Sequence, residues 1–117
     1  MVRSVLIVDD HAEFRAAARA LLEADGFTIA GEAADGGEAV RLTTELRPAI
    51  VLLDIGLPDT DGFAVADALA TLDPRPMVIF VSSRERAVYG RRIDRAPVRG
   101  FVAKHALSGP AIGELVE

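Results

Sequence analysis

The stretch that decides the fold runs from residue 50 to residue 62 and has the sequence IVLLDIGLPDTDG. Its first four residues are apolar, and an unbroken run of this kind is typical of a strand buried on both faces of a parallel sheet. Asp54 ends the run, and a charge at the end of a buried strand is costly unless a partner compensates for it. We therefore expect a polar site at the carboxyl end of this strand.

Other apolar runs in the chain also end in polar side chains. They are followed, in chain order, by Asp9 and Asp10, by Ser82, and by Lys104, which is the only lysine of the sequence. The carboxyl ends of parallel strands lie at one edge of a sheet, and ligands of α/β folds bind outside that edge. We therefore expect these side chains to converge on Asp54.

The pattern of apolar residues and turn formers predicts five strands that alternate with five helices. We expect strands at residues 4–8, 27–32, 50–54, 77–81 and 100–103 and helices at residues 12–24, 38–46, 63–72 and 86–94, with a last helix that opens at Ser108-Gly109-Pro110. Strands and helices that alternate through short connections form a parallel sheet covered on both faces. The fold class is therefore α/β, with a doubly wound five-stranded parallel sheet.

Composition limits the function further. The chain has 117 residues, half of them apolar, which suits one globular domain. It has no cysteine, so disulfides and thiolate metal sites are excluded, and a net charge of −5 argues against direct nucleic-acid binding by this domain. No apolar run approaches the roughly 20 residues that span a bilayer. Because the first residues pass straight into a strand, we expect no signal peptide, no membrane contact and a cytoplasmic location.

One part of the chain is basic. The stretch from Arg84 to Lys104 holds seven basic residues against Glu85 and Asp94. Two interpretations remain open: a solvated helix face with one buried lysine, or a surface that meets an acidic partner or a second copy of the chain.

Three carboxylates brought close together repel one another, so at least one should have a raised pKa unless a cation binds. Oxygen ligands alone favour Mg²⁺, and the lack of cysteine and of a paired histidine motif argues against zinc. A carboxylate beside such a cation can attack a phosphoryl group and form an aspartyl phosphate. Lys104 and Ser82 would then suit two of the phosphoryl oxygens. Taken singly, however, Asp9 and Asp10 could simply cap a helix, Lys104 could be an exposed strand-end lysine and Ser82 a turn serine.

Four short motifs occur together in a characteristic order. They are VDDH at residues 8–11, LDIGLPDTDG at 53–62, VSS at 81–83 and GFVAK at 100–104. In this order and spacing, the chain resembles the receiver domain of two-component response regulators. The resemblance covers essentially the whole chain and implies a (βα)5 flavodoxin-like receiver fold with strand order 2-1-3-4-5. It further implies one receiver domain over residues 1–117, which could be a fragment of a longer response regulator.

The resemblance also implies residue roles at the carboxyl edge of the sheet. Asp54 would be the phosphoacceptor, loaded by a sensor histidine kinase or a phosphotransfer protein. Asp10 would bind Mg²⁺ or Mn²⁺ directly, Asp9 mainly through water, and Asp54 and the backbone carbonyl of Gly56 would complete the protein ligands.

Three more residues would form the switch. Lys104 would pair with the phosphoryl group, Ser82 would hydrogen-bond one of its oxygens, and Phe101 would turn inward as Ser82 moves. The surface of the fourth helix and fifth strand would change as a result, and a homodimer could form on phosphorylation. Such a chain acts as a switch more than as an enzyme. The opening Asp9-Asp10-His11 also resembles the NarL/LuxR subfamily, which implies a C-terminal DNA-binding effector.

Two positions depart from the usual family pattern. His105 follows Lys104 where many receivers have a proline joined by a cis bond, and without proline a cis bond costs about 3 kcal/mol, so we predict a trans peptide or a distorted loop. Pro97 stands where a glycine is usual, so we expect the fourth helix to end differently or to be mobile. We expect His11 and His105 to lie in loops, at a cap or on the surface, without a chemical role.

Two other functions remain as alternatives. A pseudo-receiver would take no phosphoryl group and would act only as a protein-interaction module. An aspartate-nucleophile phosphohydrolase of the haloacid dehalogenase type is a poorer match, because such enzymes place the nucleophile after the first strand in an Asp-x-Asp pattern.

Overall fold

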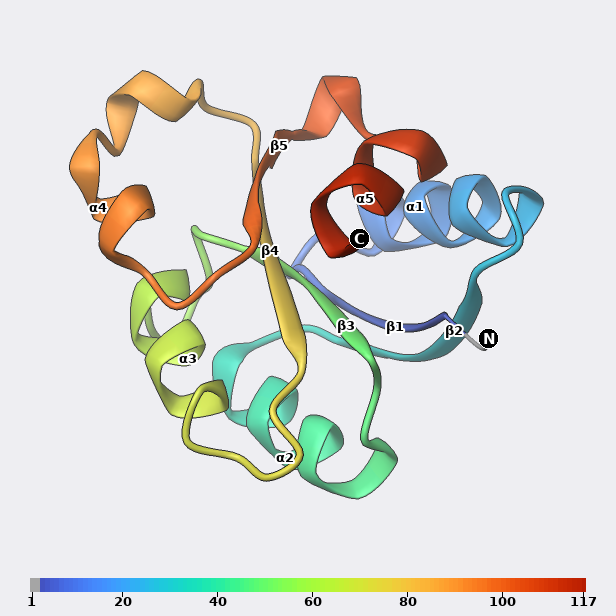
Figure 1. Ribbon diagram of the computed structural model, residues 1–117, viewed down its shortest axis with the longest axis horizontal. Helices are drawn as coiled ribbons and strands as arrows, with labels where there is room; N and C mark the ends of the chain where they lie inside the picture. The colour runs from blue at the N-terminus through green and yellow to red at the C-terminus, as the bar shows by residue number, and fades with distance from the viewer. Residues whose placement is uncertain (1–2) are drawn as a thin grey trace.

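Five parallel strands form one sheet in the order β2-β1-β3-β4-β5 in the computed structural model, which describes residues 3–117 (Figure 1). The strands are β1 Ser4–Val8, β2 Thr28–Ala33, β3 Ile50–Asp54, β4 Met77–Ser82 and β5 Gly100–Ala103. Every neighbouring pair is parallel. The predicted fold class and strand order are therefore confirmed.

Helices cover both faces of the sheet. They are α1 Ala12–Ala24, α2 Gly36–Leu46, α3 Gly62–Leu69, α4 Arg91–Arg95 and α5 Gly109–Val116, with short 3-10 turns η1 at Arg86–Val88 and η2 at Lys104–Ala106. Helices α1 and α5 lie together on one face, and α2, α3 and α4 lie on the other (Figure 1). None of the helices within residues 3–117 combines the length and the apolar character that crossing a membrane requires.

The central strand is buried from both sides, as its sequence predicts. Ile50 and Leu52 point into the core beneath α1 and α5, whereas Val51 and Leu53 point into the core beneath α2 and α3. All four side chains are almost completely buried. Because alternate residues of a strand face opposite sides, an unbroken apolar run supplies both cores at once.

Several predicted boundaries need correction. Helix α2 begins at Gly36 rather than at residue 38, because the Asp35 side chain caps it by accepting a hydrogen bond from the backbone N–H of Glu38 at 2.8 Å. The glycines that were predicted to form a turn are thus the first helical residues. Helix α3 ends at Leu69 rather than at residue 72, and strand β2 lies one residue further along the chain than predicted.

The largest correction concerns the predicted helix at residues 86–94. The structure divides it into η1 and α4, with Gly90 between them at φ 58° and ψ −136°. Backbone of that kind cannot continue a helix and is adopted readily only by glycine. Helix α4 then ends at Arg95, because Ala96 precedes Pro97 and takes the extended conformation that a following proline favours. The arginines of this basic stretch are exposed.

The segment after β5 agrees with the prediction. Among residues 3–117 the cis peptide bond lies at Asp73–Pro74, so the bond between Lys104 and His105 is trans. His105 is exposed in η2. Ser108 caps α5 by accepting a hydrogen bond from the N–H of Ala111 at 3.1 Å, and a proline occupies the first turn.

Candidate functional site

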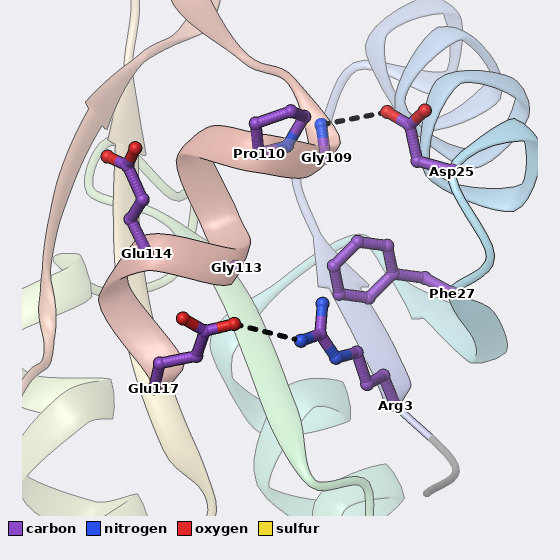
Figure 2. A pocket seen from close by; sticks show the side chains of 8 residues that line it. All are labelled: Arg3, Asp25, Phe27, Gly109, Pro110, Gly113, Glu114 and Glu117. Atoms are coloured by element: carbon purple, nitrogen blue, oxygen red, sulfur yellow. Dashed lines mark hydrogen bonds and ion pairs between the residues drawn. The ribbon is translucent and has the colours of Figure 1, made fainter.

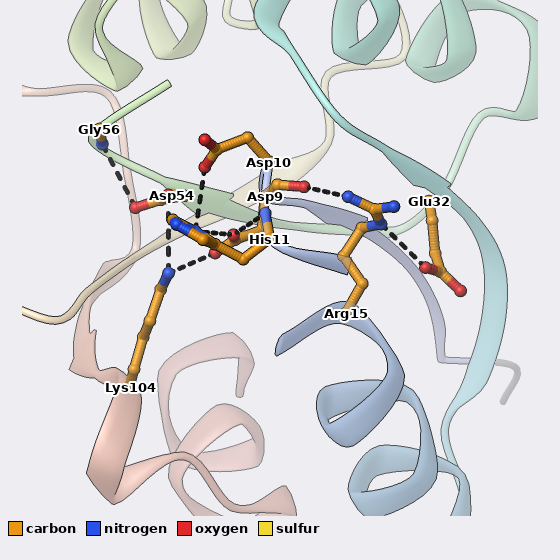
Figure 3. Close-up of polar contacts among 8 residues, drawn as sticks. All are labelled: Asp9, Asp10, His11, Arg15, Glu32, Asp54, Gly56 and Lys104. Carbon is orange, nitrogen blue, oxygen red and sulfur yellow. Dashed lines mark hydrogen bonds and ion pairs between the residues drawn. The ribbon is translucent and has the colours of Figure 1, made fainter. Parts of the chain in front are cut away.

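The carboxyl ends of the strands bring the predicted polar residues together. Asp9 directly follows β1, Asp54 is the last residue of β3, and Lys104 directly follows β5. Figure 3 shows the side chains of Asp9, Asp54 and Lys104 pointing toward one another, with Asp10 beside them. The convergence predicted from the sequence is therefore present for these four residues.

The acidic cluster combines buried and accessible carboxylates. Asp9 is 0% exposed and Asp54 is 5% exposed, whereas the Asp10 side chain is 33% exposed. One ligand atom each from Asp9, Asp10, His11 and Asp54 lies within 4.8 Å of the others. The cluster can thus be reached from solvent through Asp10 while its deeper oxygens are shielded from water.

Lys104 supplies the positive charge that the buried carboxylates need. Its Nζ lies 2.5 Å from Oδ2 of Asp9 and 3.6 Å from Oδ2 of Asp54. The ammonium also lies 4.5 Å from the ring centroid of Phe14 on α1, a cation–π contact that holds the side chain in place. Two carboxylates therefore share one ammonium.

Burial raises the pKa of Asp54 from its ordinary 3.8 to about 6, and the charge of Asp9 acts in the same direction. The Lys104 charge lowers this pKa, and so does the backbone N–H of Gly56, which donates to Oδ1 of Asp54 at 3.2 Å. The raised pKa predicted for one carboxylate of the cluster is thus found at Asp54, with burial as its largest cause and the charge of Asp9 as the second. An additional cation nearby would stabilise the ionised form of this carboxylate.

The site fits a hard divalent cation. Its donors are carboxylate oxygens, which Mg²⁺ prefers. Oδ2 of Asp9 is fully buried and accepts no hydrogen bond from the described residues, although Lys104 lies close enough to form an ion pair. An oxygen in that situation has a free lone pair for a metal ion. The structure places Gly56 at the site through its N–H, and the role of its carbonyl as a ligand stays a prediction.

A network on the far side of Asp9 fixes the end of β1. The Arg15 guanidinium donates to the backbone carbonyl of Asp9 at 2.6 Å and to Glu32 on β2 at 3.0 Å (Figure 3). Arg19 donates to the same carboxylate at 2.8 Å. The hydrogen bond from Arg19 is the largest of the effects that lower the pKa of Glu32. These contacts hold Asp9 in place without using its side chain.

The loop after β3 is anchored at two points. The Asp59 carboxylate accepts hydrogen bonds from the N–H groups of Gly36 and Gly37 at the start of α2, at 2.8 and 3.1 Å. These N–H groups, Gly36 first, hold the pKa of Asp59 below its ordinary value. At the other end of the loop, the N–H of Gly62 donates to the carbonyl of Ile55 at 2.7 Å. The loop that carries Gly56 is therefore tied to both α2 and α3.

Ser82, the last residue of β4, lies at the same edge but is held differently from the carboxylates, whereas Phe101 lies earlier along its strand, as the second residue of β5. Ser82 is 3% exposed, and its Oγ bonds the hydroxyl of Tyr89 at 2.6 Å and accepts from the N–H of Arg84 at 3.0 Å. Phe101 is half-buried, with its ring centroid 6.1 Å from that of Tyr89. In this structure Ser82 is thus engaged by the segment after β4.

Sequence reasoning missed three residues around the site. They are Arg15, Tyr89 and His11, whose Nδ1 lies 3.1 Å from carboxylate oxygens of both Asp9 and Asp10. Adjacency to the two aspartates was an available signal for His11, which occupies the N-cap position of α1 without a side-chain cap bond. Nothing in the local sequence pattern indicates the contacts of Arg15 and Tyr89.

A separate hollow of about 380 Å³ lies at the opposite edge of the sheet, between the end of α1 and helix α5 (Figure 2). Two polar contacts join the residues that line it. Asp25 accepts a hydrogen bond from the N–H of Gly109 at 3.0 Å, and Arg3 forms an ion pair with Glu117 at 3.4 Å. None of the residues that converge on Asp54 lines this hollow. It is therefore distinct from the candidate site.

Comparison with protein families gives one match that covers most of the chain. The model of the response regulator receiver domain matches residues 5–111. A transcriptional regulator of Pseudomonas aeruginosa is 42% identical over 100 residues, which are 86% of this chain and 48% of that protein. The chain spans about half the length of the curated relatives it matches.

Solved structures show the same architecture. A DNA-binding response regulator of the LuxR family from Staphylococcus aureus superposes with a TM-score of 0.88 at 25% identity, covering 99% of this chain and 100% of that one. A chain in the crystal structure of the complex of CheX and CheY with beryllofluoride and magnesium from Borrelia burgdorferi superposes with a TM-score of 0.81 at 28% identity. The match covers 97% of this chain and 85% of the matched chain.

Proposed function

The chain belongs to the family of response regulator receiver domains, and from this premise we propose that Asp54 is the residue that accepts the phosphoryl group. The observation that carries the proposal is the setting of Asp54. Its carboxylate is buried at the end of β3, its pKa is raised to about 6, and an ammonium lies 3.6 Å away. A carboxylate held in this way can be converted to an acyl phosphate whose added charge the neighbouring cations would neutralise.

The reaction we propose is transfer of a phosphoryl group from a phosphohistidine. An Asp54 oxygen attacks phosphorus, an O–P bond forms, the P–N bond of the donor breaks, and the donor imidazole leaves. The donor would be a sensor histidine kinase or a phosphotransfer protein. Lys104 would neutralise one phosphoryl oxygen and Ser82 would donate a hydrogen bond to another.

The carboxylates of Asp9, Asp10 and Asp54 and the carbonyl of Gly56 would hold a Mg²⁺ or Mn²⁺ ion. When bound, the ion would offset the negative charge that gathers on the phosphoryl oxygens. The protein residues supply the rest: Asp9 and Asp10 provide oxygens from one side, and Lys104 provides a charge from the other. The structural relative from Borrelia burgdorferi, with its beryllofluoride and magnesium, supports this assignment.

The output we propose is a change at α4 and β5. Phosphorylation adds about −1.5 to −2 charges and three acceptor oxygens, which draw Ser82 and Lys104 toward Asp54 and leave room for Phe101 to turn inward. The altered surface would promote dimerisation or act on a linked effector that binds DNA. Transcriptional regulators about twice the length of this chain support such an effector. The chain itself would not bind DNA and would act in the cytoplasm as a switch.

The test is to incubate the domain with Mg²⁺ and acetyl phosphate and to measure the mass of the peptide that contains Asp54. We expect one added phosphoryl group in the wild type and none in Asp54→Asn, which keeps the shape of the side chain. Beryllofluoride should shift the amide NMR signals of Gly56 and Lys104 in the wild type only.

Two other results would point to the alternatives. Wild-type protein that takes neither acetyl phosphate nor beryllofluoride would contradict the proposal and favour a pseudo-receiver. Continuous hydrolysis of a small phosphomonoester would favour a phosphohydrolase instead.

A further inference from the structure

The hydroxyl of Ser82 is already occupied in the unmodified chain. It shares a 2.6 Å hydrogen bond with the hydroxyl of Tyr89 and accepts a second from the N–H of Arg84 at 3.0 Å. Ser82 itself is 3% exposed, so water cannot easily replace a lost partner. The serine hydroxyl has a single proton to donate, so a phosphoryl oxygen competes with Tyr89 for it when Ser82 is the donor of their shared hydrogen bond.

Tyr89 is held in place by more than this hydrogen bond. Its ring lies between Phe63 of α3 and Phe101 of β5, with centroid distances of 6.0 and 6.1 Å and tilted contacts to both. Phe63 in turn packs against the buried Phe80 of β4 at 4.9 Å. Tyr89 also directly precedes Gly90, whose φ of 58° separates η1 from α4. A single side chain thus connects Ser82, the aromatic residue of β5 and the break before α4.

We propose that Tyr89 is a positioning residue that holds Ser82 away from the phosphoryl site until Asp54 is modified. The inference rests on the proposed function of Asp54 and adds a restraint to it. Acceptance of a phosphoryl group would exchange the Tyr89–Ser82 hydrogen bond for one between Ser82 and a phosphoryl oxygen. Because the bond to Tyr89 favours the unmodified arrangement, it should lower the apparent affinity for a phosphoryl mimic.

The same hydrogen bond links Tyr89 to the proposed change at α4 and β5. Phe101 has no hydroxyl and cannot hydrogen-bond Ser82, whereas Tyr89 does. Tyr89 contacts both residues, since its hydroxyl bonds Ser82 and its ring centroid lies 6.1 Å from that of Phe101. Release of the hydroxyl therefore has to precede or accompany any inward turn of Phe101, and it acts directly on the residue before Gly90.

The sequence provides an internal probe for the first test. Tyr89 is the only tyrosine and the chain has no tryptophan, so tyrosine absorbance and fluorescence report on this side chain alone. We expect Ser82→Ala to change the tyrosine spectrum of the unmodified protein. We expect beryllofluoride with Mg²⁺ to change the wild-type spectrum in the same direction, and to leave that of Asp54→Asn unchanged.

The second test measures the restraint. Tyr89→Phe removes the hydroxyl and keeps the ring, so half-saturation by beryllofluoride at fixed Mg²⁺, followed by the amide NMR signals of Gly56 and Lys104, should need about two- to tenfold less ligand. In a Ser82→Ala background the same substitution should have no effect, because the hydrogen bond is already absent. Tyr89→Leu, which removes the ring as well, separates the hydroxyl from the aromatic packing.

The outcomes distinguish this proposal from the previous one. If the wild type binds beryllofluoride and Tyr89→Phe binds it equally or less tightly, the restraint is refuted while the role of Asp54 stands. If Tyr89→Phe has the same effect with and without Ser82, the hydroxyl does not act through Ser82. If neither protein binds beryllofluoride, the proposed function of Asp54 fails, and the restraint fails with it.

Discussion

Lys104 is the residue on which the charge balance of the site depends. It is the only lysine in the sequence, and its ammonium contacts one fully buried carboxylate and one nearly buried carboxylate. Removal of one partner from a buried ion pair leaves an uncompensated charge, which the remaining group avoids by binding a proton. The pKa of Asp54 therefore reports how strongly the Lys104 charge stabilises the ionised carboxylate.

We predict that Lys104→Met raises the pKa of Asp54 above its value of about 6, because the Lys104 charge is one of the effects that lower it. The measurement is a ¹³C NMR titration of the Asp54 carboxyl carbon without divalent cations. Arg95→Met, which removes an exposed charge on α4, is the control and should leave the titration in place. A pKa that stays near 6 in Lys104→Met would contradict the assigned contact.

The raised pKa of Asp54 also predicts how stability depends on pH. Ionisation of Asp54 is less favourable in the folded chain, so its contribution to stability is fully present below about pH 3.8 and is lost as the pH rises through about 6. Asp54→Asn carries no such charge. Without divalent cations, its advantage over the wild type in free energy of unfolding should grow by on the order of 2–3 kcal/mol between pH 4 and pH 7.5.

Urea denaturation at several pH values measures this difference. Asp59→Asn is a control of opposite sign, because backbone N–H groups lower the pKa of Asp59 and its contribution is present above its unfolded pKa. The free energy of unfolding of Asp59→Asn should therefore fall relative to that of the wild type as the pH rises. A pH-independent difference for Asp54→Asn would show that burial does not raise this pKa.

The contact between β3 and α3 positions the loop that follows Asp54. A Cβ atom on Gly62 would lie 2.7 Å from the Cα of Ile55 and 2.8 Å from the carbonyl oxygen of Asp54, which are backbone atoms with little freedom to shift. The first residue of α3 can approach β3 this closely only because it lacks a side chain. The start of α3 thus packs directly against the end of β3 that carries Asp54.

We predict that Gly62→Ala lowers the free energy of unfolding by about 1–3 kcal/mol and weakens beryllofluoride binding, because the loop must move to relieve the overlap. Thermal unfolding and ligand titration measure the two effects. Gly56→Ala is a matched control for stability, since a Cβ atom there meets nothing within 4 Å. Equal stability of the two variants would show that the contact at Gly62 yields without cost.

The elements differ in how far the sequence predicts them. The strands were predicted to within one or two residues, because apolar runs bounded by polar residues give a strong local signal. The sequence did not predict the helix break at Gly90. A single glycine is tolerated within a helical pattern, and its φ of 58° becomes visible only in the structure.

The site shows the same division. Asp9, Asp54 and Lys104 could be placed together because each lies at the carboxyl end of a strand of one parallel sheet. The contacts of Tyr89 and Arg15 could not, because they depend on how a broken helix and a helix face lie against the sheet edge, which no short motif specifies.

At the level of the whole domain, the sheet divides two apolar cores and the acidic cluster lies at one edge of both. A ligand that binds only the folded chain stabilises all of it by mass action. We predict that Mg²⁺ at about 100 times its dissociation constant raises the free energy of unfolding by about 2.7 kcal/mol. Calorimetry with increasing Mg²⁺ should show this as a rise in Tm.

Asp10→Asn is the matched variant for this measurement. The Asp10 side chain is 33% exposed, so its replacement should leave the fold intact while it removes a proposed ligand. We expect most of the Mg²⁺-dependent rise in Tm to disappear in this variant. A rise as large as that of the wild type would show that the cation binds elsewhere on the domain.

The 2.5 Å contact between Lys104 and Oδ2 of Asp9 has a consequence for metal loading and phosphoryl transfer. The same ammonium lies 3.6 Å from Asp54, so it already bridges the two carboxylates. A divalent cation held by the acidic cluster would offset the negative charge that Lys104 now neutralises at Asp9, and the lysine would be freer to turn toward a phosphoryl group on Asp54. Metal loading and phosphoryl transfer would thus be coupled through a single side chain.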